Sequence, residues 1–118
     1  MMALNFFSSK HKKMLMERTK DCTIRLGDVS HDYKQNSIVW ITAGKKYEPK
    51  HKLYTAFLDK VRVKTIDTLS TEDLDHQDPG INTKEELIAD FERMHKRRIQ
   101  PDDTVTVIYF TEVHEDLE

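Results

Sequence analysis

Apolar residues alternate with polar ones, or run together, in five short stretches of the chain, a pattern that predicts β-strands. The stretches cover residues 4–7, 22–26, 38–42, 53–66 and 104–110. The stretch 53–66 is long enough for one strand or a bent pair, with the bend at Asp59 and Lys60. Alternation in this stretch predicts four core residues, Leu53, Phe57, Val61 and Val63. The last stretch is apolar on both faces, so we expect it to be covered on both sides.

Three other segments carry helix signals. Ser8 and Ser9 are N-cap residues for a short basic helix that reaches about residue 18. A capping box at residues 70–73 begins a helical turn that stops by residue 80. A second capping box at residues 83–86 begins a helix to about residue 97, with an apolar face of Leu87, Ile88, Phe91 and Met94.

Strands with two or three interspersed helices and no regular βαβ spacing predict an α+β fold. Five or six short strands in so small a chain would leave long exposed edges in an open sheet. We therefore expect a small, partly closed β-barrel. A length of 118 residues predicts a single domain, 1–118, with one modest core.

Composition excludes several classes of site. The three glycines are too far apart for a phosphate-binding loop, and Cys22 is the only cysteine. Cys22 shares a strand face with Ile24 and Leu26, so we interpret it as a small buried hydrophobe rather than a nucleophile. The six histidines have no zinc spacing, and we expect no metal and no cofactor. Without a long apolar run or a leader sequence, the expected location is the cytoplasm, with no membrane contact.

Charge divides unevenly along the chain, although the formal net charge is only -2. Residues 1–59 contain 11 Lys/Arg and 6 Asp/Glu, or +5, whereas residues 60–118 contain 8 and 15, or -7. A solvated basic helix face and an acidic loop would explain this division. The alternative explanation is a basic patch that holds a phosphate backbone beside an acidic rim.

The predicted strand 22–26 carries the most informative polar pair. Because strand side chains alternate, Thr23 and Arg25 project from the same face, opposite Cys22 and Ile24. A hydroxyl beside a guanidinium suits recognition of an anion or a carbonyl. Trp40 lies between Val39 and Ile41 and is expected in the core, whereas Tyr47, in a lysine-rich loop, is the better candidate for stacking a base.

The same strand belongs to a longer ordered pattern. A short strand ending in Phe6-Phe7, a basic helix, Lys20-x-x-Thr23-x-Arg25 and the strand 37–41 come first. Residues 65–69, an acidic helical segment, Glu85-Glu86-Leu87 and the strand 107–110 follow. This order resembles that of ASCH domains over nearly the whole chain. The resemblance implies a PUA-like β-barrel fold, and it extends to the small bacterial N(4)-acetylcytidine amidohydrolases.

The amidohydrolase resemblance implies a role for each matching residue. Lys20 falls at the position of the proton acceptor, Thr23 at that of the nucleophile and Asp78 at that of the proton donor, with Asp75 as a competing assignment for the donor. Arg25 would bind the substrate carbonyl or its oxyanion. The substrate would be an acylated cytidine, hydrolysed at its amide bond.

A non-catalytic RNA-binding module is the alternative reading of the same resemblance. Arg25 would then contact a base or a phosphate, and Tyr47 would stack on a base. The partner would be a modified nucleoside or single-stranded RNA. The residues expected to contact phosphate are Lys10, Lys12, Lys13, Arg18, Lys45, Lys46, Lys50 and Lys52.

Overall fold

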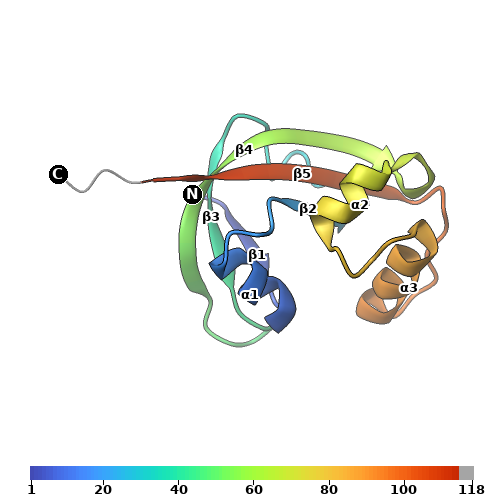
Figure 1. Ribbon diagram of the computed structural model, residues 1–118, viewed down its shortest axis with the longest axis horizontal. Helices are drawn as coiled ribbons and strands as arrows, with labels where there is room; N and C mark the ends of the chain where they lie inside the picture. The colour runs from blue at the N-terminus through green and yellow to red at the C-terminus, as the bar shows by residue number, and fades with distance from the viewer. Residues whose placement is uncertain (115–118) are drawn as a thin grey trace.

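The computed structural model of the protein describes residues 1–114, in which one sheet and three α-helices are formed (Figure 1). The strands are β1 (Ala3–Phe6), β2 (Cys22–Leu26), β3 (Ile38–Ala43), β4 (His51–Thr65) and β5 (Thr104–Val113). The helices are α1 (Ser9–Met16), α2 (Thr71–Gln77) and α3 (Lys84–His95), with a 3₁₀ turn, η1 (Ile66–Thr68). Residues 115–118 lie outside the described residues, and the single domain 1–118 stays a prediction.

The five strands are ordered β1-β3-β4-β5-β2, with β1 parallel to β3 and the other neighbours antiparallel. The long strand β4 bends strongly, so the sheet forms a half-barrel (Figure 1). The expected bend in β4 is a bulge, because the register with β5 shifts between Leu58 and Lys60. The predicted α+β class is therefore confirmed, as a curled sheet of five strands with three α-helices.

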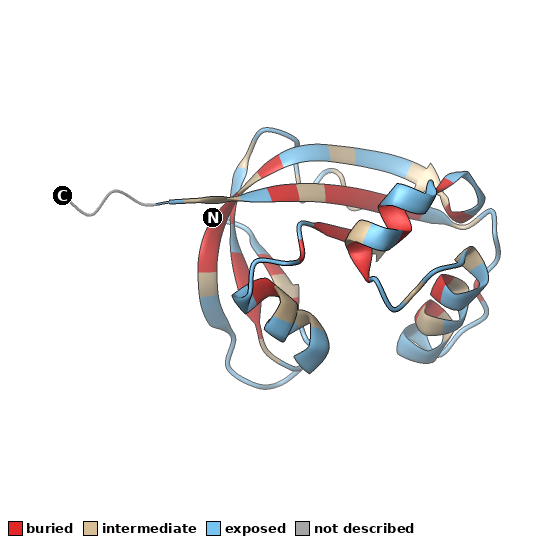
Figure 2. Ribbon diagram, viewed as in Figure 1, coloured by how far each residue is buried: buried red, intermediate tan, exposed pale blue. Residues whose placement is uncertain are grey.

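Buried apolar residues form two clusters, where the sequence predicted one core. Strand β5 contributes to both, since Val105 and Val107 pack in one cluster and Ile108 and Phe110 in the other. This confirms the prediction that β5 is covered on both faces, and Figure 2 shows it as largely buried between the other elements. The first cluster lies among α1, β1, β3 and β4, and the second lies among β2, α2 and α3.

The predicted core face of β4 is wrong in part. Tyr54, Ala56 and Leu58 are buried, and they alternate with the predicted positions Leu53 and Phe57, which are half-buried. Beyond the bulge Val61 is half-buried, whereas Val63 is 46% exposed. Both faces of this stretch carry apolar residues, so hydrophobicity alone does not decide which face turns inward.

Two further apolar residues are more exposed than the sequence predicted. Trp40 is 42% exposed, because Val39 and Ile41 on either side of it face inward and strand side chains alternate. Met94 is 40% exposed in the last turn of α3, where it lines a cavity. Cys22, by contrast, is fully buried as predicted.

The helix signals agree with the observed starts of the three helices, and α1 ends at Met16, about two residues before its predicted end. Ser8, Ser70 and Thr83 are the N-caps of α1, α2 and α3, and each hydroxyl accepts a hydrogen bond from a backbone N–H three residues later. Helix α3 ends at His95, two residues before the predicted end, because Lys96 adopts a left-handed conformation. No helix within residues 1–114 combines the length and apolar character needed to span a membrane.

Candidate functional site

A cavity of about 380 Å³ lies beside β2, between residues of β1 and α1 on one side and residues of α2 and α3 on the other. Its size is at the lower end of the range for ligand pockets, which is roughly 300–1,000 Å³. Strands β1 and β2, the N-terminal half of α1, the end of α2 and one face of α3 supply its lining. The polar and charged residues in this lining are Asn5, Ser8, Lys10, His11, Thr23, Arg25, Gln77, Asp78, Asp90 and Arg93.

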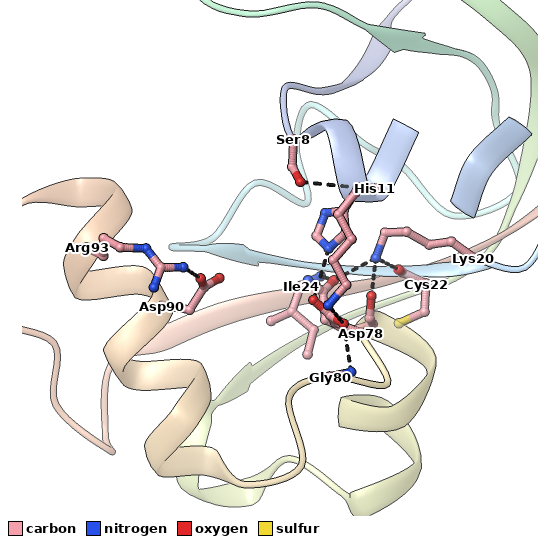
Figure 3. A network of polar contacts seen from close by, with 11 residues as sticks. Ser8, His11, Lys20, Cys22, Ile24, Asp78, Gly80, Asp90 and Arg93 are labelled. Atoms are coloured by element: carbon pink, nitrogen blue, oxygen red, sulfur yellow. Dashed lines mark hydrogen bonds and ion pairs between the residues drawn. The ribbon is translucent and has the colours of Figure 1, made fainter. Parts of the chain in front are cut away.

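Lys20 lies just before β2 and is 1% exposed, although it carries an amine. Its Nζ donates to the carbonyl of Cys22 at 2.6 Å, to the carbonyl of Gln77, and to the Gln77 Oε1 at 3.2 Å (Figure 3). Burial, with the charge of Arg25 as a smaller contribution, lowers the pKa of Lys20 to about 7. The neutral amine is therefore well populated at physiological pH.

Thr23 and Arg25 share one face of β2, as strand alternation predicted. Thr23 is 4% exposed, and its Oγ1 accepts a hydrogen bond of 3.2 Å from the Arg25 Nε. The Arg25 guanidinium also donates to the carbonyl of Asn5 at 2.8 Å and stacks on the Phe6 ring, 4.8 Å from its centroid. Burial lowers the pKa of Arg25 from its ordinary value. These contacts fix the guanidinium beside the hydroxyl.

Asp78 ends α2 and reaches across the cavity to α1. Its Oδ1 accepts hydrogen bonds from Lys10 Nζ at 2.7 Å and from the Gly80 N–H at 2.8 Å, while its Oδ2 lies 3.3 Å from His11 Nε2 (Figure 3). Burial alone would raise the pKa of Asp78, but these hydrogen bonds outweigh it and lower the pKa overall. Asp78 is therefore a carboxylate at neutral pH and bridges two helices.

Gln77 and His11 also belong to the site, and the sequence reasoning did not select them. The Gln77 Oε1 accepts from the Ile24 N–H at 2.7 Å as well as from Lys20, so Gln77 joins α2 to β2. His11 lines the cavity from α1, and burial and the charge of Lys20 lower its pKa. In the sequence, Gln77 is simply the residue before Asp78 and His11 is one of six histidines, so no motif marked either as a site residue.

The predicted catalytic residues gather at one place without forming a complete chain of contacts. Thr23, Arg25 and Asp78 line the cavity, and Lys20 lies behind its wall. Within residues 1–114, no hydrogen bond joins Lys20 to Thr23. Asp75, the competing donor, is exposed on α2 and is not part of the cavity lining.

Tyr47, the residue predicted to stack on a base, lies outside this cavity. It is 92% exposed at the tip of the loop between β3 and β4, and it does not line the cavity. Its ring instead contacts the Lys46 amine, 5.1 Å from the ring centroid. The distance between Tyr47 and the β2 face could not be read from the sequence, because it depends on the path of the loop.

The eight predicted phosphate-binding residues have different environments. Lys10 lines the cavity, whereas Lys12 and Lys45 line a neighbouring cavity of about 340 Å³. Arg18 pairs with Glu112 at 2.7 Å and stacks on Tyr54, and Lys50 donates to two carbonyls of its own loop. Lys52 lies over the Trp40 ring, and Lys13 and Lys46 are exposed.

Three solved structures are similar to this chain in fold. A DUF984 protein of Enterococcus faecalis superposes with a TM-score of 0.69 over 96% of this chain and 76% of its own, at 13% identity. The hypothetical protein PH0355 gives 0.65 over 96% and 100%, at 17% identity. An ASCH domain of Lactobacillus crispatus gives 0.53 over 93% and 77%, at 9% identity. No family model and no curated protein matches the sequence. The chain thus has an ASCH-like fold.

Proposed function

We propose that the protein is an amide hydrolase that removes the acyl group from an acylated cytidine such as N(4)-acetylcytidine. One observation carries the proposal. The Thr23 hydroxyl is held by Arg25 in a cavity of ligand size, and the low-pKa amine of Lys20 lies against the carbonyl of Cys22, the residue before Thr23. A hydroxyl, a base that is partly neutral at pH 7 and a fixed cation are the groups that acyl transfer requires.

Lys20 would act first as the base. A neutral amine has two N–H groups, which the carbonyls of Cys22 and Gln77 occupy, so it no longer donates to Gln77 Oε1, its longest contact. The lone pair that replaces this N–H would turn away from Gln77 Oε1 toward the Thr23 hydroxyl. The amine takes the proton of the Thr23 hydroxyl as Oγ1 forms a bond to the acyl carbon. Arg25 stabilises the oxyanion that develops on the carbonyl oxygen.

The proton on Lys20 would then move to the exocyclic nitrogen of cytidine as the C–N bond breaks, and water would hydrolyse the acyl-threonine. Asp78 was predicted as the proton donor, but its lowered pKa favours the carboxylate. We therefore assign Asp78 a different role, in which its carboxylate accepts a hydrogen bond from the exocyclic N–H of the cytosine. Lys10 and His11 hold the carboxylate at the cavity wall.

The test is to incubate the pure protein with N(4)-acetylcytidine and to follow cytidine by chromatography. We expect Thr23→Ala to lower kcat by at least about 10³-fold, while Thr104→Ala, an exposed threonine on β5, leaves it unchanged. Because Lys20 must lose its proton, kcat/KM should rise as the pH increases through about 7. No release of cytidine between pH 6 and 9, or release by Thr23→Ala at the original rate, would contradict the proposal.

A non-catalytic RNA-binding module is the second candidate, and the resting contacts of Lys20 favour it. Within residues 1–114 its amine donates three hydrogen bonds, to Cys22 and Gln77, and none to Thr23. In this case the same cavity would hold an RNA base without reaction. Affinity for a short RNA should then fall steeply with salt, because each neutralised phosphate releases counterions, and no cytidine should form.

A further inference from the structure

We propose that the acylated cytidine is presented within a single-stranded RNA, whose chain continues from the first cavity into the second past Phe7. This inference rests on the proposed function and names the substrate as an oligonucleotide rather than a free nucleoside. The first cavity would hold the acylated base, and the second would hold the adjoining nucleotide and its phosphates.

The two cavities are neighbours. Phe6, Phe7 and Ser8 line both of them, in the short turn between β1 and α1. The Ser8 hydroxyl fixes this turn by accepting a hydrogen bond from the His11 N–H. The volumes, about 380 and 340 Å³, are similar, so the second cavity is of the right size to take one further nucleotide.

Phe7 has the exposure expected of a stacking residue. Phe6 is 3% exposed and packs in the core against Phe110, whereas Phe7 is 51% exposed between the two cavities. An exposed aromatic ring offers a face to any base, and such stacking is independent of sequence. A single nucleoside in the first cavity has no second base for this ring, whereas an oligonucleotide has one.

The second cavity carries the charge that a phosphate backbone needs. Lys12 lines it from α1, Lys45 from the β3–β4 loop, and His51 from the first position of β4. Glu48, also in the loop, is the acidic residue in the lining. The first turn of α1, which borders the cavity through Ser9, contains no acidic side chain. Lys12 and Lys45 thus line the same cavity from two different elements, and their amines would neutralise about two phosphates there.

The experiment compares the affinities of two probes for a Thr23→Ala protein, which binds without turnover. One probe is N(4)-acetylcytidine, and the other is a labelled single-stranded oligoribonucleotide with one N(4)-acetylcytidine, followed by fluorescence anisotropy. We expect the oligonucleotide to bind at least about tenfold more tightly. Phe7→Ala should weaken its binding about tenfold and should weaken the binding of the nucleoside less, because only the oligonucleotide offers a second base to the Phe7 ring.

The lysine variants report on the phosphates. Replacing Lys12 and Lys45 together by alanine should lower the slope of log affinity against log salt by about 1.4, since each phosphate on a single strand contributes about 0.7. Lys34→Ala and Val63→Ala, changes at exposed residues outside both cavities, are the controls. Thermal unfolding checks that each variant is folded.

Equal affinities for the two probes, or an oligonucleotide affinity that neither Phe7→Ala nor the double lysine variant changes, would overturn the inference. Hydrolysis by the unmodified protein is measured separately. Release of cytidine from the free nucleoside together with equal affinities would leave the proposed reaction standing and remove the oligonucleotide substrate. Tight oligonucleotide binding with no hydrolysis would instead remove the reaction and support the path of the RNA chain.

Discussion

At the scale of single residues, the unusual feature is an amine without access to water. Burial is the largest influence on the pKa of Lys20, which falls to about 7, while an unfolded chain would leave it near 10.4. The spacing of Lys20, Thr23 and Arg25 in the sequence indicated the candidate site residues in β2 and just before it. It gave no sign of Gln77, because the contact between residues 57 positions apart depends on how α2 packs on β2.

The shifted pKa predicts how stability depends on pH. Between about pH 7 and 10 the unfolded protein keeps the Lys20 proton and the folded protein does not, so the free energy of unfolding rises with pH. We expect this rise, of at most about 1.4 kcal/mol per pH unit, to be absent in Lys20→Met. Urea unfolding of both proteins between pH 7 and 9.5 measures it. Parallel curves for the two proteins would contradict a low pKa for Lys20.

At the scale of elements, the end of α2 determines the geometry behind the cavity. The sequence predicted the N-cap of this helix and its end near residue 80, and it predicted β2 with its correct bounds. It did not predict the buried face of β4, because apolar residues lie on both faces and a bulge changes the register. The conformations of the turn at Phe7 and of the β3–β4 loop are likewise set by packing rather than by alternation.

Gln77 allows the link between α2 and β2 to be tested. Gln77→Leu removes the acceptor of the buried Ile24 N–H and of the Lys20 amine, so we expect a loss of stability of about 1–3 kcal/mol. Gln77→Glu should instead raise the pKa of Lys20, since a carboxylate favours the ammonium. Chemical denaturation and NMR titration of the Lys20 side chain are the measurements. Gln100→Leu, an exposed glutamine, is the matched control and should change neither.

At the scale of the whole molecule, a chain with a net charge of -2 has its basic and acidic halves in different elements. The basic half contains α1 and the β3–β4 loop, which form the walls of the second cavity, while the acidic half contains α2 and α3. Net charge is a property of the whole chain, whereas a phosphate group responds to charges within about 10 Å. Charge counted by halves is therefore a better guide than the total to the elements where a phosphate contact is expected.

Strand β5 has a consequence for the motions of the protein, because it is shared by both clusters of buried residues. Either cluster can loosen locally while the other still holds β5 in place. The backbone amides of Val107 and Ile108 should therefore exchange with solvent only when the whole chain unfolds. Native-state hydrogen exchange should show them as the slowest amides, with α1 and α3 opening independently and at lower free energy. Equal protection of α3 and β5 would indicate that the two clusters unfold as one unit.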